Sequence, residues 1–153
     1  MHWLERKIIP PFQVLILGTV EWWLHRSIGF LHYHFGFEYL LSRILLVIAL
    51  VLVVASIYPF WRHKTTVNPV KLGDTSSLIT TGMFGFSRNP IYVADALVLV
   101  AWTVYLGFWG GLILVPVFIA YITRFQIMPE ERVLAEKFGA QYSAYCAGVR
   151  RWL

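Results

Sequence analysis

The sequence has few charged residues for its length. Asp, Glu, Lys and Arg make up 14% of its 153 residues, whereas hydrophobic residues make up 58%. A soluble domain carries roughly a quarter charged residues, so this chain lacks the polar surface that would keep it dissolved in water. The composition therefore argues against an ordinary soluble domain and predicts an integral membrane protein.

Signals for disulfides, dinucleotides and metals are also scarce. Cys146 is the only cysteine, which excludes a disulfide framework within the chain. The sequence contains no Gly-x-Gly-x-x-Gly fingerprint for a dinucleotide. His25, His32 and His34 lie near Glu38, but they lack a recognised spacing of metal ligands. We therefore expect no resident metal ion, and we interpret Cys146 as a structural residue.

Four long apolar stretches are present instead. They cover residues 8–24, 44–61, 91–109 and 110–122, and the last is expected to continue as helix towards residue 128. Each is close to the roughly 20 residues that a helix needs to cross a bilayer. We predict an all-α polytopic membrane protein with about four transmembrane helices, followed by a C-terminal helical segment that is cytoplasmic or interfacial.

The distribution of Lys and Arg indicates an orientation. With four spans, both termini and the loop between spans two and three share one side of the membrane. Only Arg26 and Arg43 would lie on the other side. The shared side would hold Arg6, Lys7, Arg62, Lys64, Lys71, Arg88, Arg124, Arg132, Lys137, Arg150 and Arg151. This bias predicts a protein of the bacterial inner membrane with both termini in the cytoplasm.

The net charge of +5 follows from this topology. We expect the basic residues to face anionic lipid headgroups, and we expect no binding to nucleic acid. The chain is predicted to be one membrane domain, residues 1–153, with three parts. Residues 1–62 would form two spans, residues 63–90 a polar cytoplasmic loop, and residues 91–153 a helical hairpin followed by C-terminal helices.

The end of the polar loop is the densest group of functional residue types. Gly82 and Gly85 allow tight turns or a close approach of the backbone to a ligand. Arg88 carries a permanent charge and a planar fork of donors that suits a carboxylate, although an interfacial anchor is an equal alternative. Pro90 suits the first turn of a helix. This loop is therefore the predicted place of chemistry.

A second group lies near the C-terminus. Pro129, followed by Glu130 and Glu131, is typical of a helix start, since acids there are stabilised by the helix dipole. Leu134, Phe138, Tyr142 and Tyr145 then recur at helical spacing and predict one apolar stripe that packs on the membrane surface or against the spans. Gly139 is a candidate break between two short helices.

Together these motifs resemble the isoprenylcysteine carboxyl methyltransferase family of integral-membrane methyltransferases, a group that includes phospholipid methyltransferases. The resemblance covers about residues 63–153. It rests on Thr65-Thr66-Val67-Asn68-Pro69, Thr80-Thr81-Gly82-Met83-Phe84, Ser87-Arg88-Asn89-Pro90-Ile91-Tyr92, Glu130-Glu131 and Phe138-Gly139 with Tyr142 and Tyr145. Asn89 stands where the eukaryotic members have His, which excludes an imidazole base there.

The resemblance implies methyl transfer from S-adenosylmethionine, bound at the cytoplasmic face, to a lipophilic small molecule or lipid. It implies that Glu130 or Glu131 holds the ammonium or ribose of the cofactor. The remaining cofactor-binding residues would be Gly82, Phe84, Asn89, Pro90 and Tyr92. Arg88 would act as a catalytic residue that orients an anionic or electron-rich acceptor, or it would bind the carboxylate of the cofactor.

Two acids fall within predicted spans, where ionisable residues are functional candidates. Asp95 lies one turn beyond Tyr92 and is predicted to be catalytic, binding the acceptor or pairing with Arg88 or Arg124. Glu21 is expected to snorkel to the interface or to pair with His25. Two other functions stay open at this point. One is a non-catalytic membrane scaffold or assembly protein, and the other is an NADPH-dependent membrane reductase.

Overall fold

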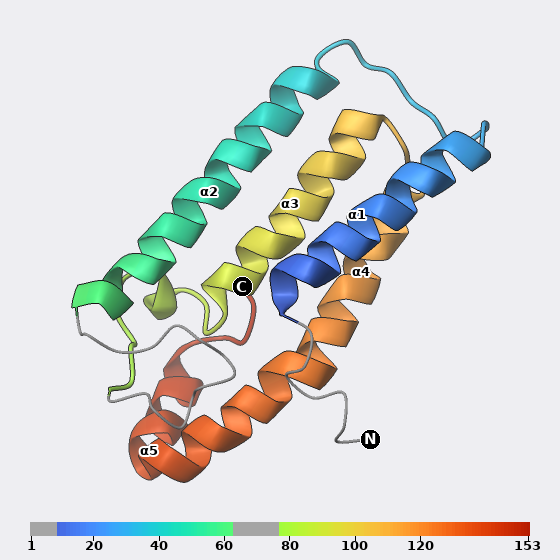
Figure 1. The fold of residues 1–153 in the computed structure, drawn as a ribbon. Coiled ribbons are helices and arrows are strands. Elements are labelled where there is room, and N and C mark those ends of the chain that lie inside the picture. Colours follow the sequence, from blue (N-terminus) through green and yellow to red (C-terminus); the bar gives the residue numbers. More distant parts are fainter. Residues whose placement is uncertain (1–8, 63–76) are drawn as a thin grey trace.

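The computed structural model describes residues 9–62 and 77–153, and helices dominate both ranges (Figure 1). The helices are α1 (Pro10–Ser27), α2 (Glu38–Arg62), the 3-10 helix η3 (Gly82–Gly85), α3 (Pro90–Leu106), α4 (Gly111–Ile122), the π-helix η4 (Thr123–Ile127) and α5 (Met128–Gly148). Among these residues there is no strand, and the one β-bridge joins His32 and Phe108. The predicted all-α class is therefore confirmed.

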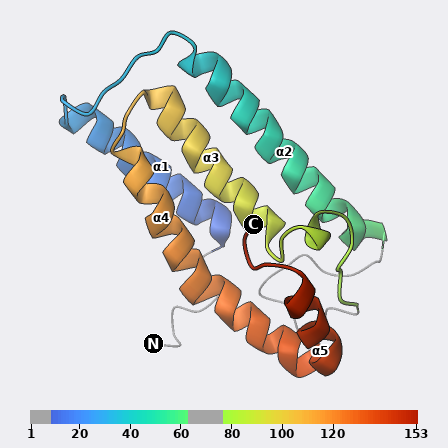
Figure 2. The same cartoon turned by 180° about the vertical axis from the view of Figure 1, so that it is seen from behind.

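Helix α3 lies at the centre of the bundle and contacts α1, α2 and α4 (Figures 1 and 2). Ala94 and Ala101 on α3 are completely buried, and such small residues let neighbouring helices approach closely. The core cluster is built from α3, α4 and η4, with Tyr92, Leu99, Phe118, Ile122 and Ile127 as its buried members. The first turn of α3 is thereby fixed from several sides.

Two helical segments are long and apolar enough to cross a membrane. One is α2, and the other is the continuous helix Gly111–Gly148, which begins with α4. Helix α3 is apolar but has only 17 residues, and α1 carries Gln13, Glu21 and Arg26 among its 18 residues. The described residues thus contain two candidate spans by length and composition, fewer than the four that the sequence pattern predicts.

The surface of α2 agrees with a membrane environment. Only 17% of its most apolar window is buried in the protein. The large side chains that it exposes are almost all apolar, among them Ile44, Val47, Leu50, Val51 and Val54. A core helix of a soluble protein would bury these side chains, so their exposure favours contact with lipid.

Two glycines with positive φ, Gly107 and Gly139, end or kink helices. Gly107 ends α3 with a φ of +60°, and a Cβ there would lie 2.5 Å from the carbonyl oxygen of Tyr33. Gly139 has a φ of +49° and kinks α5, as the sequence pattern predicts. The kink turns the second half of α5 back, so that the C-terminal end of the chain returns to the start of α3 (Figures 1 and 2).

The prediction for Glu21 is wrong. Its side chain is completely buried, so it does not snorkel, and neither carboxylate oxygen has a hydrogen-bond partner. The buried Nδ1 of His25 is also without a partner. The Glu21 carboxylate instead lies against Thr103 and the Cα of Gly111. A glycine at the start of α4 leaves the space that this carboxylate fills.

Candidate functional site

A cavity of about 440 Å³ opens at the end of the bundle where α3 begins. This volume lies within the range of small-molecule sites, roughly 300–1,000 Å³. The predicted site residues that line it are Phe84, Arg88, Asn89, Pro90, Tyr92, Asp95, Glu130 and Glu131. Gly82 is not among the lining residues. It lies in η3 with a φ of +64°, where it allows the chain to turn beside Pro59.

The start of α3 is fixed by the C-terminal segment of the chain. The Asn89 backbone N–H donates to Ser87 Oγ at 3.1 Å, and Pro90, which follows, needs no donor of its own in the first helical turn. The Asn89 side-chain amide donates to the Arg151 carbonyl at 2.8 Å instead of capping α3. The backbone at Arg151, which is outside α3, thus fixes the motif Arg88–Tyr92 in place.

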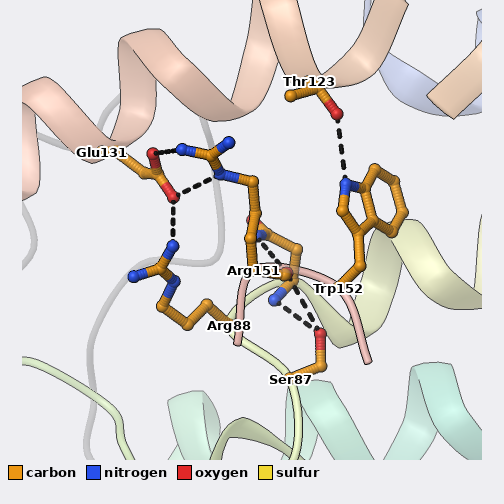
Figure 3. A network of polar contacts seen from close by, with 7 residues as sticks. Ser87, Arg88, Thr123, Glu131, Arg151 and Trp152 are labelled. Atoms are coloured by element: carbon orange, nitrogen blue, oxygen red, sulfur yellow. Dashed lines mark hydrogen bonds and ion pairs between the residues drawn. The ribbon is translucent and has the colours of Figure 1, made fainter. Parts of the chain in front are cut away.

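Glu131 is bound by two guanidinium groups (Figure 3). Arg88 Nη2 lies 3.1 Å from Glu131 Oε1. Arg151 donates from Nε to Oε1 at 3.0 Å and from Nη2 to Oε2 at 2.7 Å. Hydrogen bonding to this carboxylate raises the pKa of the Arg151 guanidinium above its ordinary value. The predicted pairing of Asp95 with Arg88 is therefore not found, because Arg88 pairs with Glu131.

Glu130 is held by a different set of donors. The Tyr92 hydroxyl and Gln126 Nε2 both donate to its Oε1, each at 2.6 Å. Tyr92 and Gln126 are buried, so this carboxylate is oriented by two fixed side chains from α3 and η4. Glu131 therefore binds two guanidinium cations, whereas Oε1 of the adjacent Glu130 accepts from two neutral donors.

Three polar atoms around the cavity are buried and have no hydrogen-bond partner. They are Arg88 Nε, Asp95 Oδ2 and Ser77 Oγ. Buried polar groups in proteins nearly always find a partner, so these atoms are available to a polar ligand in the cavity. Asp95 is the deepest of them along α3, one helical turn beyond Tyr92.

Aromatic side chains form another wall. Phe84 in η3 packs edge-on against Phe60 at a ring distance of 5.4 Å, and the Tyr145 hydroxyl donates to the Phe84 carbonyl at 2.7 Å. Tyr142 and Tyr145 both line the cavity, whereas the sequence pattern predicted only a packing stripe for them. Aromatic rings of this kind offer stacking surfaces to a flat heterocycle.

Sequence reasoning also missed three residues that support the site from outside the cavity lining. Gln126 lies four residues before Glu130 on the same helix, a spacing that could have indicated the contact. Ser87 and Arg151 are 64 residues apart in the chain, and no local pattern joins them. The motif Thr65–Pro69, which carries part of the resemblance, lies outside the described residues.

An apolar groove of about 600 Å³ runs between α1, α2 and α3. Its lining on α3 comprises Val98, Leu99, Trp102 and Tyr105, so it begins about one turn beyond Asp95. Gly18 on α1 faces Trp102, whose indole N–H donates to the Gly18 carbonyl at 3.0 Å. The cavity at the start of α3 and the apolar groove therefore follow each other along α1, α2 and α3.

Comparisons with known proteins identify the family of the chain. An uncharacterized protein of Haemophilus influenzae is 46% identical over 66 residues, which cover 41% of this chain and 100% of that protein. No solved structure matches the chain. The sequence model of the family described as phospholipid methyltransferase matches residues 37–141. Because this match includes α2, the start of α3 and the Glu130–Glu131 pair, the chain belongs to the phospholipid methyltransferase family.

Proposed function

We propose that the protein is a membrane-embedded methyltransferase that uses S-adenosylmethionine and acts on a lipophilic acceptor. The family supports methyl transfer. The observation that carries the proposal is the cavity itself, which collects both acids of the Glu130–Glu131 pair, Arg88 and Asp95, with an apolar groove further along the same helices. A polar methyl donor and an apolar acceptor both find matching surfaces there.

The residues of the cavity fit the groups of this cofactor. It carries an ammonium, a carboxylate, a ribose and an adenine, and it supplies an electrophilic methyl group when bound. Glu130 and Glu131 offer acceptors for the ammonium and the ribose hydroxyls, and Arg88 Nε offers a donor for a carboxylate. Phe84 and Tyr145 offer a stacking surface for the adenine.

In such a reaction the protein aligns the acceptor with the methyl group and excludes water. Holding the two reactants in line contributes much of the rate when the electrophile is already activated. Pro90, Tyr92 and Tyr142 are buried around the cavity, and we expect them to limit the access of water to it. Asp95 is the α3 residue of the cavity nearest in sequence to the groove, and its unpartnered oxygen can take the proton of an attacking nucleophile or hold a cationic acceptor.

The groove supports an acceptor with a long apolar chain. It is lined by side chains of α1, α2 and α3 that carry few polar atoms, and it lies on the membrane side of Asp95. An acceptor that enters sideways from the bilayer would place its chain among Leu46, Val98 and Trp102 and its reactive group at Asp95. The cofactor would enter from the opposite end.

We also propose the four-span topology with both termini and the cofactor site in the cytoplasm. Helix α3 would cross a thin region of the bilayer, and α1 would be shielded by its buried polar face, which includes Gln13 and Glu21. The bias of Lys and Arg supports this orientation. Cysteine labelling from either side of inverted membrane vesicles tests it, with single cysteines at Gly29 and Arg132 in a Cys146→Ser background.

Calorimetric titration with S-adenosylhomocysteine in lipid nanodiscs tests the function. We expect saturable binding by the wild type and at least about tenfold weaker binding by Glu131→Gln, since hydrogen bonds to charged groups contribute about 1.5–3 kcal/mol. Glu136→Gln is the matched control, because Glu136 is exposed on the same helix and does not line the cavity.

Two results would overturn the proposal. No binding by the wild type in detergent and in nanodiscs would favour a non-catalytic membrane scaffold. Saturable binding of NADPH in place of S-adenosylhomocysteine would favour a reductase. If binding is found, transfer of a labelled methyl group to lipid extracts identifies the class of acceptor.

A further inference from the structure

The C-terminal segment that follows α5 is bound to the site through its backbone. The Arg88 N–H donates to the Arg150 carbonyl at 2.9 Å, and the Asn89 amide donates to the Arg151 carbonyl at 2.8 Å. The Trp152 indole N–H donates to Thr123 Oγ1 at 3.1 Å. Figure 3 shows this segment between α3 and the helix that carries Glu131. These contacts do not depend on the side chain of Arg151.

The side chain of Arg151 makes a separate set of contacts. Its two hydrogen bonds to Glu131 use both oxygens of the carboxylate, which is the bidentate geometry that guanidinium and carboxylate groups prefer. Arg88 reaches Glu131 through a single nitrogen, at 3.1 Å. Arg88 and Glu131 line the cavity, whereas Arg151 does not. Arg151 therefore acts on the cavity through Glu131.

The contacts of Arg151 with Glu131 leave Arg88 with uncompensated charge. Two guanidinium cations share one carboxylate, so the group of Arg88, Glu131 and Arg151 carries one positive charge in excess. Arg88 Nε is buried and has no hydrogen-bond partner. If Arg151 did not occupy Glu131 from the far side, Arg88 would be free to form the bidentate pair itself, and its charge would be neutralised.

We propose that Arg151 is a positioning residue of the cofactor site, which holds Glu131 so that Arg88 keeps free donors for the carboxylate of the bound cofactor. The inference rests on the proposed function for the identity of the ligand. It adds a role for the C-terminal segment and assigns Arg88 to the cofactor's carboxylate and not to the acceptor.

The test compares two ligands in nanodiscs, S-adenosylhomocysteine and its decarboxylated analogue. The wild type is expected to bind the carboxylate-bearing ligand about tenfold or more tightly than the analogue, because a charge-assisted hydrogen bond is lost with the carboxylate. In Arg151→Ala we expect this ratio to fall towards one. A role of Arg151 in folding alone would weaken the binding of both ligands equally and leave the ratio unchanged.

Two further variants complete the test. Arg151→Lys keeps a cation near Glu131 without the bidentate fork, so its ratio is expected between those of the wild type and Arg151→Ala. If Arg151→Ala does not fold, Arg151→Lys is the variant that tests the proposal. Arg150→Ala is the matched control, because Arg150 is exposed and contributes its backbone carbonyl to the site; its ratio should equal that of the wild type.

The outcomes separate this inference from the proposed function. If the ratio of the two affinities in Arg151→Ala equals that of the wild type, the positioning role is overturned and the cofactor site stays in place. If only Arg151→Lys folds, an unchanged ratio in that variant has the same meaning. A wild type that binds both ligands with equal affinity would refute the role of Arg88 at the carboxylate. A wild type that binds neither ligand would overturn the proposed function and this inference together.

Discussion

The hydrogen bond between Tyr92 and Glu130 joins α3 to α5, and its removal gives a sharp test of the packing. Tyr92→Phe deletes one oxygen and keeps the ring, which belongs to the buried core with Leu99 and Phe118. The bond spans 38 residues of sequence, and its length of 2.6 Å is typical of a hydroxyl that donates to a carboxylate. Its loss therefore affects how α5 is attached to the bundle.

The expected magnitude follows from the surroundings of the bond. Hydrogen bonds to charged groups contribute about 1.5–3 kcal/mol, and Tyr92 is only 8% exposed. Gln126 still donates to the same oxygen in the variant, which places the loss near the lower end of that range. We expect Tyr92→Phe to lower the free energy of unfolding by about 1.5–2 kcal/mol.

Reversible unfolding in mixed micelles, followed by tryptophan fluorescence, measures this loss. Tyr39→Phe is the control, because Tyr39 is 53% exposed and should change the free energy by no more than about 0.5 kcal/mol. A double-mutant cycle with Glu130→Gln isolates the pair. A coupling energy indistinguishable from zero would refute the contact between α3 and α5.

Three further predictions address the rest of the molecule. Asp95→Asn should lower the rate of methyl transfer at least about tenfold while changing the affinity for S-adenosylhomocysteine less than about twofold; radiolabel transfer and calorimetry measure the two effects. Gly18→Leu should fill the groove beside Trp102 and raise KM for long-chain acceptors. Gly18→Ala should not raise KM, because its Cβ would lie 3.7 Å from that ring. Equal KM values in both variants would exclude the groove as the acceptor site. Gly111→Ala should destabilise the bundle, because its Cβ would overlap Glu21 Oε1 and lie 2.5 Å from Thr103 Oγ1; thermal unfolding should then show partial recovery in the double variant with Glu21→Ala.

The parts of the site that the sequence predicts are those whose residues are neighbours in the chain. Arg88, Asn89, Pro90 and Tyr92 lie within one helical turn, so a helix that begins at Pro90 brings them together. The pair Glu130–Glu131 is likewise local. The two groups share one cavity because of the tertiary structure. No local pattern predicts this, and the expectation came from the family resemblance.

The parts that sequence reasoning missed depend on how helices are rotated and where the chain returns. Arg151 reaches Glu131 because the kink at Gly139 reverses α5, and the length and direction of the segment after the kink are not visible in a hydrophobic pattern. Glu21 is buried because Gly111 leaves room for its carboxylate on a facing helix. Hydropathy measures the cost of placing Glu21 in a span, and it contains no information about a particular vacant volume.

The two ends of the bundle differ in charge, and this difference connects the site to its surroundings. The loop end carries Arg26, which lies over the Trp22 ring at 5.0 Å, and Arg43 near the start of α2. The cavity end carries Arg62, Arg88, Arg132, Arg150 and Arg151. A basic rim attracts anionic headgroups and anionic parts of ligands over about a Debye length. The same cations that favour a cytoplasmic orientation therefore lie where a water-soluble cofactor would enter. Glu131 pairs with two of them, Arg88 in the cavity lining and Arg151 behind it.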